Sequence, residues 1–264
     1  MLVPSPAGRL YAEVTGKGPI VVLQHGLCGD ITQPQEVFPK DRGFSHAAMD
    51  CRGHGHSPAG DFQALTIAHF TDDLAQMIDL LPTAPVAVGG ISMGAAMALR
   101  LAVTRPDLVP ALILSRPAWV TEDAPTNMQP NAVVGRTLPL GLAAFEASET
   151  ARMLAIEGPD NLASLRGFFS RANPDVTAAL LMRISADGPG VTEGDLAALR
   201  VPVLVLGSGE DYVHPLAHAE ALTRMIPGAR FVELPPKGRD KARHLAACQT
   251  AILQFLEGLD HAET

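Results

Sequence analysis

Short apolar runs and stretches with apolar residues at helical spacing alternate along most of the chain. Ile20 to Gln24 and Ala111 to Ser115 are almost entirely apolar, a pattern typical of strands that are buried on both faces. After Thr66, apolar side chains recur every three or four positions, which predicts an amphipathic helix capped by that threonine. Strands that alternate with helices predict a parallel sheet with helices on both faces.

These patterns place seven strands and four helices outside the middle of the chain. The predicted strands cover residues 8–14, 20–24, 45–49, 85–89, 111–115, 201–206 and 230–234. The predicted helices cover residues 67–81, 95–103, 215–225 and 244–256. The expected fold class is therefore α/β.

Strand patterns are missing from the middle of the chain. Residues 140–155, 161–170 and 174–185 have helical patterns, and no apolar run of strand type separates them. The sequence therefore predicts a core domain formed by residues 1–119 and 201–264, with residues 120–200 inserted as a mostly helical unit.

The composition of the chain indicates which partners and which cellular location are expected. The 264 residues carry a net charge of -8, and no lysine- or arginine-rich run occurs, which argues against nucleic acid or an anionic membrane as partner. No stretch of 18 apolar residues and no signal-peptide pattern is present, so neither a membrane span nor secretion is expected. The few, widely spaced cysteines Cys28, Cys51 and Cys248 are typical of reduced thiols, and we expect a cytoplasmic protein.

Gly90-Ile91-Ser92-Met93-Gly94 fits the pattern G-x-S-x-G. An apolar strand precedes it and an alanine-rich helix follows, which is the context of a sharp turn that raises a serine hydroxyl above a sheet. The two glycines allow the turn and let the helix pack closely. Ser92 is therefore the predicted nucleophile.

A serine hydroxyl needs a base, and the base needs a carboxylate that orients it. In this architecture the order along the chain is serine, acid, histidine. Asp211 follows the strand 201–206 and is the predicted acid, with the adjacent Glu210 as its competitor. His244 opens the last predicted helix and is the predicted base.

An acyl-transfer site also needs backbone N–H groups for the developing oxyanion. Met93 follows the nucleophile at the start of a helix, where the helix dipole favours negative charge. Leu27 lies in the small-residue loop after the strand 20–24. The N–H groups of Leu27 and Met93 are the predicted oxyanion hole.

Taken together, these features resemble the alpha/beta-hydrolase superfamily, over nearly the whole chain outside the insertion. The matching points are His25-Gly26, the Asp50-to-Ser57 turn, the Gly90-to-Gly94 motif, Gly209-x-Asp211 and His244. The resemblance implies a mostly parallel sheet of about eight strands, a helical cap inserted after the sixth strand, and the triad Ser92, Asp211 and His244. Serine at position 92 argues against the aspartate-nucleophile branches, the haloalkane dehalogenases and epoxide hydrolases.

The predicted function is hydrolysis of small to medium carboxylic esters or lactones through an acyl-enzyme, with no cofactor and no metal. The partner is a small-molecule substrate, and the sequence gives no oligomeric state. A C–C hydrolase, a thioesterase, a perhydrolase, a lyase and a non-catalytic ligand-binding protein on the same fold remain alternatives.

Several further residues are candidates for contact with substrate. Trp119 lies where the sheet gives way to the insertion, so it either lines the cleft or packs at the hinge. Met128 also could face the cleft. The insertion carries arginines that either bind a substrate carboxylate or lie on solvated helix faces, namely Arg152, Arg166, Arg171 and Arg183. The histidines have no zinc-binding spacing.

Overall fold

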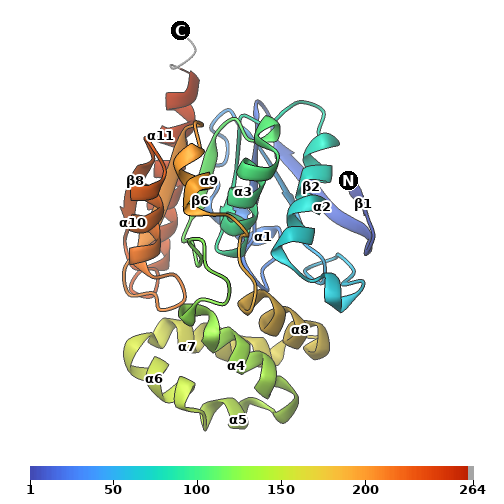
Figure 1. Ribbon diagram of the computed structural model, residues 1–264, viewed down its shortest axis with the longest axis vertical. Helices are drawn as coiled ribbons and strands as arrows, with labels where there is room; N and C mark the ends of the chain where they lie inside the picture. The colour runs from blue at the N-terminus through green and yellow to red at the C-terminus, as the bar shows by residue number, and fades with distance from the viewer. Residues whose placement is uncertain (261–264) are drawn as a thin grey trace.

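A single eight-stranded sheet forms the centre of the protein. The computed structural model describes residues 1–260, and Figure 1 shows the sheet with helices around it. The strands are β1 (Leu2–Ser5), β2 (Gly8–Gly16), β3 (Ile20–Gln24), β4 (Ser45–Met49), β5 (Ala87–Ile91), β6 (Leu112–Ser115), β7 (Val203–Ser208) and β8 (Arg230–Leu234). Their spatial order is β1-β2-β4-β3-β5-β6-β7-β8. Strand β2 pairs antiparallel with both of its neighbours, β1 and β4. All the other neighbouring pairs, from β4-β3 to β7-β8, are parallel.

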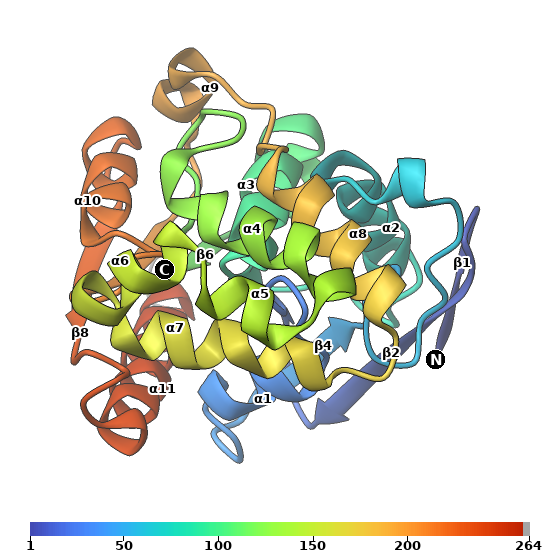
Figure 2. The same ribbon diagram turned by 90° about the horizontal axis from the view of Figure 1, so that it is seen from below.

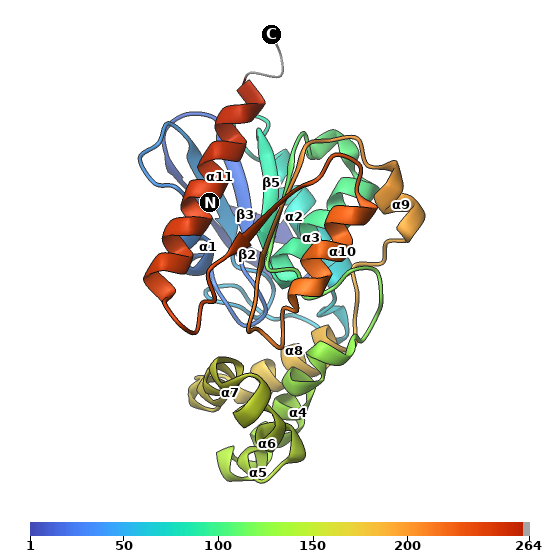
Figure 3. The ribbon, with the colours of Figure 1, turned by 90° about the vertical axis from the view of Figure 1, so that its left-hand side faces the viewer.

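Helices cover both faces of this sheet, as Figure 3 shows edge-on. They are α1 (Thr32–Val37) and α11 (Lys241–Asp260) on one face, and α2 (Ile67–Asp79), α3 (Met93–Thr104) and α10 (Leu216–Met225) on the other. Successive strand residues point to opposite faces, so the two faces build separate cores. In β7, Val205 belongs to the core that α2, α3 and α10 cover, and Leu204 and Leu206 belong to the core that α11 covers. The prediction of an α/β fold with a mostly parallel sheet is confirmed.

The predicted cap of helix α2 is present. The Thr66 hydroxyl accepts a hydrogen bond from the backbone N–H of His69, which satisfies one of the open donors of the first turn. The apolar side chains of α2 at Phe70, Leu74 and Met77 are fully buried. Helical spacing therefore identified the buried face of this helix correctly.

Six helices lie between β6 and β7. They are α4 (Gln129–Thr137), α5 (Leu142–Glu146), α6 (Glu149–Glu157), α7 (Pro159–Arg166), α8 (Pro174–Ser185) and α9 (Glu193–Ala198). Helices α4 to α8 gather at the edge where the parallel strands end, and Figure 2 shows them from below. Helix α9 instead packs beside α10. That the segment 120–200 acts as a cap domain stays a prediction.

Candidate active site

Ser92 occupies a strained turn between β5 and α3. Its φ of 56° is in the left-handed region, which a residue with a side chain rarely adopts. The neighbouring glycines are needed for close backbone approach. A Cβ on Gly90 would lie 2.4 Å from the carbonyl carbon of Gly94, and one on Gly94 would lie 2.4 Å from the backbone oxygen of Gln24. The turn therefore holds the serine at the carboxyl edge of the sheet, as the motif predicts.

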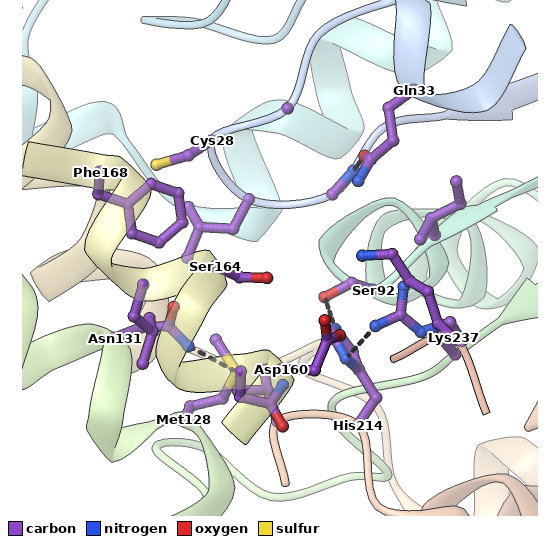
Figure 4. A pocket seen from close by; sticks show the side chains of 18 of the residues that line it. Cys28, Gln33, Ser92, Met128, Asn131, Asp160, Ser164, Phe168, His214 and Lys237 are labelled. Atoms are coloured by element: carbon purple, nitrogen blue, oxygen red, sulfur yellow. Dashed lines mark hydrogen bonds between the residues drawn. The ribbon is translucent and has the colours of Figure 1, made fainter. Parts of the chain in front are cut away.

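The imidazole of His214 lies against this serine. His214 Nε2 is 2.9 Å from Ser92 Oγ, and His214 Nδ1 is 3.0 Å from each carboxylate oxygen of Asp211. Since a carboxylate only accepts, Nδ1–H donates to Asp211, and Nε2 is left to accept from the serine hydroxyl. Figure 4 shows His214 and Ser92 joined in this way. Serine, histidine and aspartate thus form a continuous hydrogen-bonded chain.

The structure does not bring His244 to Ser92, so that prediction is wrong. Helix α11 begins three residues earlier than His244, at Lys241. The His244 ring turns back toward the end of β8, with Nδ1 2.8 Å from the backbone oxygen of Pro235 and Nε2 3.7 Å from Cys248 Sγ. His214 follows Asp211 by three residues, on the loop that already carries the acid. That short spacing was the signal in the sequence that could have identified it.

Asp211 is held by several donors. Its Oδ1 accepts from Asn161 Nδ2 at 2.8 Å, and its Oδ2 forms an ion pair with Arg116. Burial opposes ionisation of Asp211, but His214 and Arg116 outweigh it and hold the pKa of the carboxyl well below its usual value. The competing Glu210 is exposed and pairs with Arg239. The structure therefore brings Asp211, and not Glu210, to a histidine beside Ser92.

The environment of His214 favours the neutral imidazole. Burial lowers its pKa, the carboxylate of Asp211 raises it, and the guanidinium of Arg116 lowers it again, with a pKa below the ordinary value of histidine as the result. A neutral imidazole is the form that can accept a proton from a hydroxyl. His214 is therefore in the state of a general base at neutral pH.

Leu27 lines the same cavity as Ser92, and Met93 follows the serine in the chain. Gly26 N donates to Gln33 Oε1 at 2.6 Å and Cys28 N donates to His54 Nε2 at 3.0 Å, so the loop between them is fixed on both sides of Leu27. Within residues 1–260, the N–H groups of Leu27 and Met93 donate no hydrogen bond. Both remain open to an acceptor.

A cavity of about 340 Å³ lies over Ser92, between the sheet edge and helices α4 and α7. Met128 lines it, as predicted from the sequence. Trp119 does not: it is 2% exposed, and its indole N–H donates to the backbone oxygen of Asp187 at 2.9 Å. Of the two interpretations of Trp119, packing at the hinge agrees with the structure and the cleft-lining one is wrong.

The arginines of the insertion differ in surroundings. Arg171 lines the cavity, donates to the backbone oxygen of Cys28 and lies 5.5 Å from the centre of the Phe168 ring. Arg166 pairs with Glu146 at the surface. Arg183 donates to Gln63, and Arg152 is exposed. Only Arg171 of these four is among the residues that line the cavity.

Nothing in the described part of the chain forms a metal-binding cluster, because no three His, Cys, Asp or Glu side chains between residues 1 and 260 come together in a suitable way. In the same range, no helix combines the length and apolar character that crossing a bilayer requires. The three cysteines are free thiols and all are buried. Burial raises the pKa of Cys28 to about 12, so its thiol is inert at neutral pH.

Comparison with known proteins identifies the family of this chain. A family model described as serine aminopeptidase, S33, matches residues 17–234, most of the chain. The chain belongs to this alpha/beta-hydrolase family. A pimeloyl-[acyl-carrier protein] methyl ester esterase from Methylococcus capsulatus is 30% identical over 230 aligned positions, which cover 83% of this chain and 87% of that protein.

Two further likenesses extend over nearly the whole hydrolase. A protein of Caulobacter sp. (strain K31), provisionally named carbamate hydrolase RutD, is 31% identical over 94% of this chain and 96% of its own length. The structure of a thermophilic esterase from Thermogutta terrifontis superposes with a TM-score of 0.73 at 26% identity, over 98% of both chains. These two likenesses agree with the family assignment over nearly the whole chain.

Proposed function

We propose that this protein hydrolyses small to medium carboxylic esters or lactones through an acyl-enzyme, with Ser92, His214 and Asp211 as its triad. The observation that carries the proposal is the 2.9 Å contact between Ser92 Oγ and His214 Nε2 inside a cavity. Relatives named as esterases support the ester bond as the target. His214 takes the role that the sequence assigned to His244.

In the first half of the reaction, His214 Nε2 accepts the hydroxyl proton as Ser92 Oγ attacks the ester carbonyl. Asp211 keeps the proton on Nδ1 and stabilises the imidazolium that forms. The ion pair between Arg116 and Asp211 fixes the carboxylate that performs this task. The imidazolium then protonates the leaving alcohol, and the acyl group remains on the serine.

The open N–H groups of Leu27 and Met93 are the proposed donors to the carbonyl oxygen. One such donor is typically worth about 3 kcal/mol in the transition state. In the second half, His214 takes a proton from water, which attacks the acyl-enzyme and releases the acid. No step needs a metal or an organic cofactor.

The cavity volume limits the size of the substrate. About 340 Å³ is near the lower end of the range for small-molecule pockets, so a short to medium acyl group is the best fit. Asn131 of α4, Ser164 and Leu165 of α7, and Met128, which directly precedes α4, contribute to the wall. We therefore also propose that this helical segment acts as the cap that selects the substrate.

Carbamate cleavage is a second candidate, favoured by the relative provisionally named as a carbamate hydrolase. A carbamate presents the same kind of carbonyl carbon to Ser92, and the same donors would receive its oxygen. Only the leaving group and the acid that is released differ from ester cleavage.

A fluorophosphonate probe followed by a substrate panel tests the proposed function. The wild-type protein should be labelled at Ser92 and should hydrolyse members of a graded series of esters, lactones and carbamates. Ser92→Ala should lose both properties, with turnover reduced by roughly 10⁶. A wild-type protein that neither labels nor turns over any panel member, while a known serine hydrolase labels beside it, would be a ligand-binding protein instead.

A further inference from the structure

A second cavity, of about 230 Å³, adjoins the one over Ser92. Four residues line both cavities: Gln33, Ile91, Arg116 and Lys237. Ile91 directly precedes Ser92 in the chain, so this junction lies next to the reacting hydroxyl. The other three residues carry hydrogen-bond donors, and none of the four is acidic.

Lys237 has a positive charge without an ion-pair partner among residues 1–260. Burial and the neighbouring Arg116 lower its pKa, although Asp160 and Asp211 act in the opposite direction. Lys241, which lines the second cavity only, is different because it pairs with Glu36 at 3.0 Å. A half-buried ammonium without an anion is an unbalanced charge that a bound anion would stabilise.

The amide of Gln33 is oriented by the backbone. Its Oε1 accepts from Gly26 N at 2.6 Å, which fixes the oxygen end of the amide. The Nε2 group therefore remains as the donor, and no hydrogen bond from it is found within residues 1–260. Figure 4 shows Gln33 and Lys237 on the same side of the pocket as Ser92.

The guanidinium of Arg116 has spare donors as well. Its Nη2 contacts Asp211 and His214, and its Nε is buried with no hydrogen-bond partner in residues 1–260. Asp211 forms an ion pair with Arg116, and Asp160 also lines the first cavity, so Lys237 is the junction residue whose charge has no ion-pair partner within residues 1–260. One unbalanced positive charge with neighbouring N–H donors matches a monoanion better than a dianion.

We propose that Lys237, Gln33 and Arg116 bind a carboxylate carried by the substrate, so that the preferred substrates are esters that also bear a free acid group. The inference rests on the proposed function and names its substrate class. Hydrolysis of a half-ester of a dicarboxylic acid adds water across the ester C–O bond and releases an alcohol and a dicarboxylate. The carboxylate at the junction is unchanged by the reaction.

Matched substrates test this proposal. The acyl-side pair is the mono-4-nitrophenyl ester of glutaric acid and the same ester with its free acid converted to a primary amide. The alcohol-side pair is the butyryl ester of glycolic acid and that of glycolamide. For at least one pair, wild-type kcat/KM should be about tenfold or more higher for the acid than for the amide.

Lys237→Met should abolish that preference, and Gln33→Glu should reverse it because a new negative charge faces the substrate acid. Lys241→Met is the matched control and should keep the preference. The melting temperature of each variant shows whether it is folded. The preference should also fall with added salt.

The outcomes separate the two proposals. One outcome is that the wild-type protein hydrolyses the amide esters in a Ser92-dependent way but does not prefer the acid in either pair. Another is that Lys237→Met keeps the wild-type preference for the acid. In both cases the proposed carboxylate site is wrong and the proposed function stands. If no ester is hydrolysed and Ser92 is not labelled by a fluorophosphonate, both proposals fail.

Discussion

The segments that follow β7 and β8 both carry a histidine, yet the structure places the two imidazoles differently. The loop after β7 lies at the carboxyl edge of the sheet, where His214 contacts Ser92 and Asp211 contacts His214. After β8 the chain passes Pro235 and Lys237 before α11 begins, and His244 lies in the first turns of that helix with its ring against Pro235. This first loop supplies two members of the hydrogen-bonded chain, whereas the segment after β8 supplies the cation of Lys237 and an imidazole packed at the start of α11.

This difference shows that the order of residues along the chain is weaker evidence for a catalytic histidine than the place in the fold that its segment can reach. A histidine far from the acid satisfies the expected order serine, acid, histidine, but so does a histidine three residues after the acid. Which of them meets the serine depends on where a loop ends and a helix begins, and boundaries of that kind are hard to read from a sequence.

Removing the charge of the acid in the first loop should have the largest effect among the next three tests. Asp211→Asn should lower kcat by roughly 10⁴ on a neutral ester, because an asparagine stabilises the wrong tautomer of His214. Steady-state kinetics on the purified variant measure this, with circular dichroism as the check on folding. Full activity in Asp211→Asn would show that another group orients the imidazole.

The guanidinium of Arg116 should shift the acid limb of the pH profile of kcat/KM. Activity needs neutral His214, whose pKa lies below the ordinary value of about 6.5, so wild-type kcat/KM should stay high below that pH. Arg116→Met removes a cation that disfavours the imidazolium. The pKa of His214 then rises, and the half-maximal point of kcat/KM moves to higher pH.

Arg105→Met serves as the control for that experiment, because Arg105 is exposed and pairs with Asp107. Its acid limb should coincide with that of the wild type. An acid limb that is unmoved or shifted to lower pH in Arg116→Met would contradict the electrostatic account of His214.

The smallest effect on activity and stability is expected from the surface ion pair between the loop after β7 and the loop after β8. Glu210 pairs with Arg239, and both side chains are at least half exposed. Surface ion pairs are typically worth about 0–1 kcal/mol, so Glu210→Gln should change the free energy of unfolding by no more than that and leave kcat/KM close to the wild-type value. Urea unfolding and ester kinetics measure the two quantities. A collapse of activity would return the acid role to Glu210.

Most of the fold could be predicted because its strands and helices have strong patterns. Seven of the eight strands and the large helices α2, α3, α10 and α11 lie where apolar runs and helical spacing place them, with ends displaced by a few residues. Outside residues 120–200, the missed strand is β1, a four-residue edge strand that contains Pro4, and the missed α-helix is α1, which has six residues, contains Pro34 and has no side-chain cap. Elements this short show too few positions to reveal a period.

The candidate site was predictable where local geometry fixes a residue. Ser92 is determined by its glycine neighbours, and Asp211 by the strand before it. Trp119 could not be assigned, because an aromatic side chain at a hinge faces either the core or the cleft, and the bond from its indole N–H to Asp187 decides this only in three dimensions. Lys237, Gln33 and Arg116 were missed because they belong to three separate loops or helices and share no motif.

The most direct test of the central claim compares the two histidines. His214→Ala and His244→Ala are reacted with a fluorophosphonate at neutral pH, and the rate of Ser92 labelling is measured for each by mass spectrometry of the intact protein. The labelling rate of His214→Ala should fall by several orders of magnitude, while His244→Ala should label at close to the wild-type rate. Fast labelling in a folded His214→Ala variant, together with loss of labelling in a folded His244→Ala variant, would contradict the central claim.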